Sequence, residues 1–81
     1  MAQKILIAED DVFLSSLLKT RLTKEGFEVV AVADGEAAHR ALIAGAFALV
    51  LLDLMLPKRS GLEVLRLMRE RDDRTPVLVL T

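Results

Sequence analysis

Short apolar runs alternate along this chain with segments in which apolar residues recur at helical spacing. The runs are rich in Val, Ile and Leu, and most are bounded by charged residues, glycine or proline, a pattern typical of buried strands. We therefore predict strands at residues 4–8 (KILIA), 27–33 (FEVVAVA), 47–53 (FALVLLD) and 77–81 (VLVLT).

The segments between these runs carry helix start and stop signals. The first helix is expected to begin at Asp11 and to end before Gly26, and the second is expected to be capped by Asp34. A third helix is expected at Ser60, because Ser60 followed three residues later by Glu63 forms a capping box.

Each predicted helix has an apolar stripe that is expected to face the core. The stripes are Leu14, Leu17, Leu18 and Leu22 in the first helix, Ala38, Ala41 and Leu42 in the second, and Leu62, Leu65 and Met68 in the third.

This order of elements predicts an α/β fold with a parallel sheet and helices on both of its faces, because strands that alternate with helices are joined by right-handed crossovers. At 81 residues the chain is at most one small domain. Because it stops at the end of a predicted strand, we expect residues 1–81 to be the amino-terminal portion of a longer domain.

Composition excludes several classes of protein. With 11 basic and 12 acidic side chains the net charge is −1, so the chain lacks the basic surface expected of a nucleic-acid-binding protein. The absence of cysteine excludes disulfides and thiolate metal sites. No segment approaches membrane-spanning length. From charge, cysteine content and segment length together, we expect a cytoplasmic protein that contacts neither DNA nor membrane.

Acidic residues follow two of the predicted strands. Glu9, Asp10 and Asp11 come directly after the first strand, and Asp53 closes the third. In an open parallel sheet ligands bind at the carboxyl ends of the strands, where Thr81 would also lie. Carboxylates that converge there would repel one another unless a cation such as Mg²⁺ lay between them.

Such a site could make an aspartate a nucleophile toward phosphorus, because a divalent cation offsets the charge of the incoming group. Simpler interpretations remain open for each residue. Asp10 or Asp11 could cap the first helix, Asp53 could be an ordinary loop residue, and a threonine that ends a strand, such as Thr81, is usually structural.

Three motifs, in this order and at these separations, resemble the receiver domain of two-component response regulators. They are ILIAEDD (residues 5–11), LVLLDLMLPKRSGLEVL (49–65) and TPVLVLT (75–81), and the resemblance covers the whole chain. It implies a flavodoxin-like (CheY-like) sheet with strand order 2-1-3-4, incomplete after the fourth strand.

The resemblance also implies roles for individual residues. Asp53 would be the phosphoacceptor, with a histidine kinase or phosphotransfer protein as partner. Asp10 and Asp53 would bind Mg²⁺ directly, Glu9 through water, and Met55 through its main-chain carbonyl. Thr81 would be the switch hydroxyl that reaches the phosphoryl oxygens.

Other residues near these motifs are expected to have structural roles. Pro57 and Gly61 would shape the turn beside the site, and Lys58 and Arg59 would lie in an exposed loop. His39, the single histidine, is expected on a solvated face of the second helix.

The chain departs from the family pattern where it ends. Receivers have a fifth strand followed by a lysine that pairs with the phosphoryl group, and neither is among these residues. The resemblance implies a signalling module rather than an enzyme, and the missing lysine leads us to expect impaired phosphorylation. The edge of residues 77–81 would be open, which favours a homodimer or higher oligomer.

Two rival functions remain. The chain could be a self-associating structural or engineered fragment whose acidic site is vestigial. A metal-dependent phosphohydrolase or a nucleotide-binding protein could use a similar sheet, but the glycine-rich loop of a nucleotide site is missing after the first strand.

Overall fold

The computed structural model describes residues 2–80, and within them strands and helices alternate as the sequence predicts. The elements are β1 (Lys4–Ala8), α1 (Val12–Lys24), β2 (Glu28–Val32), α2 (Gly35–Ala44), β3 (Leu49–Leu52), α3 (Gly61–Glu70) and β4 (Val77–Val79). The later strands are shorter than predicted, because the predicted runs extend beyond the residues that pair with a neighbouring strand, for example at Phe27 before β2 and Phe47 before β3.

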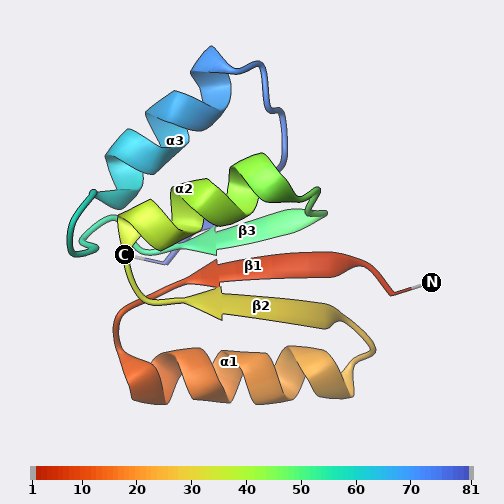
Figure 1. The fold of residues 1–81 in the computed structure, drawn as a ribbon. Helices are drawn as coiled ribbons and strands as arrows, with labels where there is room; N and C mark the ends of the chain where they lie inside the picture. The colour runs from red at the N-terminus through yellow and green to blue at the C-terminus, as the bar shows by residue number, and fades with distance from the viewer. Residues whose placement is uncertain (1, 81) are drawn as a thin grey trace.

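The strands form a parallel sheet in the order β2-β1-β3-β4, which confirms the predicted fold class. The helices cover both faces, with α1 on one side and α2 and α3 on the other (Figure 1). Among the described elements, β1 and β3 lie in the middle of the sheet and β2 and β4 at its edges.

The core lies on both faces of the two central strands. Ile5, Ile7 and Leu51 are buried on the face that α1 covers. Alternate residues of the same strands point to the other face, where they pack with the inner side chains of α2 and α3. Their buried members include Leu6, Ala8, Val50, Leu52, Ala38, Leu42, Val64 and Met68.

The predicted apolar stripe is confirmed for α2, where Ala38 and Leu42 are buried, but it is partly wrong for the other two helices. Leu17 of α1 is 57% exposed, because α1 packs on the core through Leu18 and Leu22 instead. Leu62 of α3 is 63% exposed, since α3 turns Val64 toward the core instead.

Side-chain caps start all three helices at the predicted residues. The carboxylate of Asp11 accepts a hydrogen bond from Leu14 N–H at 3.2 Å, and that of Asp34 accepts one from Ala37 N–H at 2.7 Å. Gly26, with a φ of 97°, follows the end of α1 in the left-handed conformation that glycine adopts most readily.

Within residues 2–80, none of the helices is long and apolar enough to cross a membrane.

Candidate functional site

The register of the sheet brings the acids of two segments together. Ala8 pairs with Val32 on one side and with Leu52 on the other. The hydrogen-bond ladder continues for one more residue, since Glu9 N–H donates to the Val32 carbonyl (3.1 Å) and Asp53 N–H to the Ala8 carbonyl (3.0 Å). Glu9 and Asp53 therefore leave neighbouring strands at the same carboxyl edge.

Three carboxylates meet at this edge, as the sequence predicts. Glu9, Asp10 and Asp53 each offer an oxygen, and these oxygens lie within 4.8 Å of one another. Glu9 is 5% exposed and Asp53 is 7% exposed, whereas Asp10 is open to solvent. Carboxylate oxygens of this number, with one open side for water, are a donor set that suits Mg²⁺.

The two buried acids are held by main-chain donors. Asp11 N–H donates to Glu9 Oε2 and Met55 N–H donates to Asp53 Oδ1, both at 2.9 Å. Burial raises the pKa of Glu9 above its ordinary value and the negative charge of Asp53 raises it further, while the bond from Asp11 acts in the opposite direction. Negative charge on the cluster is thus electrostatically unfavourable, and a bound cation would reduce the repulsion between the carboxylates.

Gly61, predicted to shape the turn, fits closely against the site. Its N–H donates to the Leu54 carbonyl at 2.9 Å. A Cβ atom at this position would lie 2.1 Å from the carbonyl oxygen of Asp53. Only glycine therefore lets the start of α3 approach the main chain of Asp53 this closely.

Gly35 is a second close contact, and sequence reasoning missed it. A Cβ atom there would lie 1.7 Å from the Arg59 carbonyl oxygen, and Gly35 N–H donates to the Pro57 carbonyl at 3.1 Å. The β3–α3 loop (residues 53–60) therefore rests on the first turn of α2. The available signal is the glycine directly after Asp34, since Asp34 by itself is explained as a helix cap.

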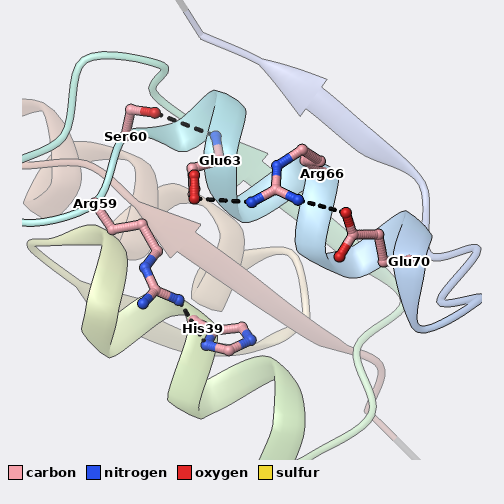
Figure 2. A network of polar contacts seen from close by, with 6 residues as sticks. All are labelled: His39, Arg59, Ser60, Glu63, Arg66 and Glu70. Atoms are coloured by element: carbon pink, nitrogen blue, oxygen red, sulfur yellow. Dashed lines mark hydrogen bonds and ion pairs between the residues drawn. The ribbon is translucent and has the colours of Figure 1, made fainter.

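The expectation of an exposed loop is right for Lys58 and wrong for Arg59. Lys58 is exposed, and its Nζ lies 4.0 Å from Asp34 Oδ2. Arg59 is half-buried and contacts His39, which is itself half-buried rather than on a solvated face (Figure 2). Packing of the loop on α2 accounts for both corrections.

The predicted roles of two site residues, Thr81 and Met55, stay predictions. Thr81 lies outside the described residues. Met55 follows Asp53 by two residues and has an 80% exposed side chain, so its expected role depends on its main-chain carbonyl alone.

Comparison with known proteins shows the family of this chain. The chain matches the protein family described as the response regulator receiver domain over residues 5–81. The chain belongs to this family. Its carboxylate cluster lies where a receiver of two-component signalling is expected to carry its acidic pocket.

Receiver sequences are also found among the relatives. The chain is 47% identical to the response regulator protein PmrA of Pseudomonas aeruginosa, over 96% of this chain and 35% of that protein. It is 46% identical to the uncharacterised transcriptional regulatory protein YkoG of Bacillus subtilis, over 95% of this chain and 34% of that protein. The chain therefore spans about a third of the length of these curated relatives.

Solved receiver structures share the fold. The receiver domain of the sensor histidine kinase PA1611 of Pseudomonas aeruginosa, which has a magnesium ion in its active-site cleft, matches with a TM-score of 0.94 and 30% identity, over 100% of this chain and 68% of that chain. The response regulator TrrA of Thermotoga maritima, in complex with Mg²⁺ and BeF, matches with a TM-score of 0.82 and 32% identity, over 95% of this chain and 65% of that chain.

Proposed function

We propose that this receiver accepts a phosphoryl group on Asp53 from a histidine kinase or a phosphotransfer protein, with Mg²⁺ bound at the same site. The observation that carries the proposal is the meeting of Glu9, Asp10 and Asp53 at the carboxyl edge of the sheet. Membership of the receiver family and the magnesium ion of a solved relative support it.

In this proposal Asp10 and Asp53 bind Mg²⁺ directly, Glu9 binds it through water, and the main-chain carbonyl of Met55 completes the set. The ion offsets the negative charge of the phosphoryl group. A carboxylate oxygen of Asp53 attacks phosphorus, the new O–P bond forms, and the N–P bond to the donor histidine breaks. Met55 N–H, which already donates to Asp53 Oδ1, keeps the carboxylate oriented for this attack.

Thr81 completes the proposal as the switch residue. Its hydroxyl would bond a phosphoryl oxygen after transfer and so convert a new charge into a shift of the main chain. This assignment rests on the match of residues 75–81 to the family motif.

The protein acts in this proposal as a signalling module and not as an enzyme with turnover on a free substrate. We place it in the cytoplasm, because relatives such as YkoG are named as transcriptional regulatory proteins.

For the 81-residue polypeptide by itself, we propose slow phosphorylation. The lysine that the family resemblance places after a fifth strand is not among these residues, and loss of one donor to the charge that develops in a transition state slows an acyl-transfer enzyme about 10²-fold or more. We expect a loss of the same order here. We also propose that this polypeptide forms a homodimer or higher oligomer through the edge of β4, where Leu78 is 57% and Val79 is 44% exposed.

The decisive experiment is incubation with acetyl phosphate and Mg²⁺ followed by intact-mass analysis. We expect a species heavier by one phosphoryl group, formed slowly, which is lost in Asp53→Asn and when Mg²⁺ is chelated. Asp72→Asn is the matched control, because Asp72 is exposed and outside the site.

Equal labelling of Asp53→Asn and the parent chain would contradict the phosphoacceptor assignment. A complete absence of labelling, together with no saturable Mg²⁺ binding, would favour the rival in which the site is vestigial.

A further inference from the structure

The β3–α3 loop is fastened to α2 at successive points. It contains Asp53 and Met55, and farther along the Pro57 carbonyl accepts a hydrogen bond from Gly35 N–H at 3.1 Å. Lys58 pairs with Asp34 at 4.0 Å. The loop that contains two of the proposed metal ligands, Asp53 and Met55, is thus positioned by contacts with a different element.

A side-chain hydrogen bond adds one more point of attachment. Arg59 NH1 donates to His39 Nδ1 at 3.1 Å and so connects the loop to α2 (Figure 2). A guanidinium has donors only, so Nδ1 must be the unprotonated nitrogen of the ring. His39 therefore serves here as a neutral imidazole with its proton on Nε2.

The surroundings of His39 oppose its protonation. Arg59 faces it from the loop and Arg71 from the end of α3, and both charges are positive. Partial burial is the main cause that lowers the pKa of His39 below its usual 6.5, and the charges of these two arginines lower it further.

The loop also contains a strained residue that requires such support. Lys58 has a φ of 68°, a left-handed conformation that is unfavourable for a residue with a Cβ. Its two neighbours in the chain, Pro57 and Arg59, are hydrogen-bonded to α2 as well. Release of Arg59 would leave this strained turn with one contact fewer.

We propose that His39 is a positioning residue that, as a neutral imidazole, binds Arg59 and holds the β3–α3 loop in its Mg²⁺-binding arrangement. The proposal rests on the proposed function for the metal site itself. His39 touches neither the ion nor the phosphoryl group. Its protonation breaks the bond to Arg59 and lowers the affinity for Mg²⁺.

The direction of the pH effect follows from the lowered pKa of His39. Above about pH 6.5 the imidazole is neutral in both the folded and the unfolded chain, and its bond to Arg59 is fully present. As the pH falls below that value, the unfolded chain takes up the proton first, so the folded state loses stability. The loss is complete once the pH is below the pKa of His39 in the folded protein, and the bond to Arg59 is lost there as well.

The first test is an NMR titration of the metal-free protein. We expect His39 to titrate with a midpoint below 6.5, and the amides of residues 58 and 59 to shift with the same midpoint. In Arg59→Leu the midpoint should rise and the amide shifts should disappear. If the amides of residues 58 and 59 do not shift as His39 titrates, the proposal is overturned, regardless of the result for Mg²⁺ binding.

The second test compares Mg²⁺ affinity between pH 8 and pH 5. His39→Gln retains an acceptor for Arg59 but cannot be protonated, and His39→Lys has a permanent charge. Relative to His39→Gln, the parent chain should lose about tenfold more affinity on acidification, the lower end of the range for outer-shell partners. His39→Lys should be weaker by a similar factor at every pH. Ala44→Lys, at an exposed site on α2, controls for the added charge.

The outcomes separate the two proposals. Saturable Mg²⁺ binding that is lost in Asp53→Asn, but with the same pH profile in the parent chain and His39→Gln, would overturn the role of His39 alone. An absence of saturable Mg²⁺ binding in the parent chain would overturn the proposed function, and the metal role of His39 with it.

Discussion

At the scale of single residues, the site combines two buried acids with two glycines that have no room for a side chain. Glu9 and Asp53 are buried beside each other, an arrangement that raises the pKa of Glu9 and disfavours the charged cluster. Gly61 lets α3 approach the main chain of Asp53, and Gly35 lets the β3–α3 loop approach α2, at distances that a Cβ atom would prevent. The acids are the proposed Mg²⁺-binding and phosphoacceptor groups, and the glycines allow the close main-chain packing around them.

We predict that Gly61→Ala destabilises the chain by about 1–3 kcal/mol, the usual effect of an extra group in a packed site. The new Cβ would meet the main chain of Asp53, which cannot move without disturbing β3. Mg²⁺ affinity should fall as well. Urea unfolding and Mg²⁺ titration measure the two effects.

Gly45→Ala is the matched control. A Cβ there would have its nearest neighbour at 3.6 Å, an ordinary contact, so stability should change little. Equal stability of Gly61→Ala and the parent chain would show that the approach of α3 to Asp53 is not tight.

At the scale of elements, the start of α3 connects the site to the helix. Ser60 Oγ accepts a hydrogen bond from Glu63 N–H at 3.2 Å, half of the predicted capping box. The carboxylate of Glu63 bonds Arg66 at 3.0 Å, and Arg66 also bonds Glu70 (Figure 2). Exposed pairs of this kind contribute little to stability. The cap therefore matters more than the ion pairs along the helix.

We predict that Ser60→Ala lowers the free energy of unfolding by about 1 kcal/mol, because an N–H at the start of α3 loses its partner. Ser16→Ala is the control, since Ser16 is exposed within α1 and alanine favours helix. Denaturant unfolding monitored by circular dichroism measures both variants. A loss in Ser16→Ala as large as that in Ser60→Ala would contradict the capping role.

At the scale of the whole molecule, β4 is an edge of the sheet within the described residues. The Pro76 carbonyl and Leu80 N–H bond β3, so the alternate residues Val77 and Val79 direct their main-chain N–H groups to the open side. An edge that combines open donors with exposed Leu78 is a template for another strand. This is the surface through which we propose self-association.

We predict that the 81-residue chain sediments as a dimer or larger species, and that Leu78→Lys shifts it toward monomer because a charged side chain blocks edge pairing. Leu62→Lys is the matched control, since Leu62 is similarly exposed but lies on α3. Val79→Pro removes an outward N–H while leaving the bonds to β3, and should act like Leu78→Lys. A monomeric parent chain, independent of concentration, would rule out the homodimer.

The sequence by itself determined the features that depend on local interactions. The caps at Asp11, Asp34 and Ser60 need only a side chain and the N–H groups of the next turn. The strands need only apolar runs of the right length. The placement of Glu9 and Asp53 at one edge also followed, because every strand of a parallel sheet ends on the same side.

Only the tertiary structure decided how separate elements meet. It showed that Leu17 and Leu62 lie outside the core, because the exposure of a helical residue depends on which neighbour its helix packs against. It also showed that the β3–α3 loop packs against Gly35 and that His39 accepts a hydrogen bond from Arg59. These partners are far apart in the chain, and no local pattern records a contact that exists only once α2 has packed beside the loop.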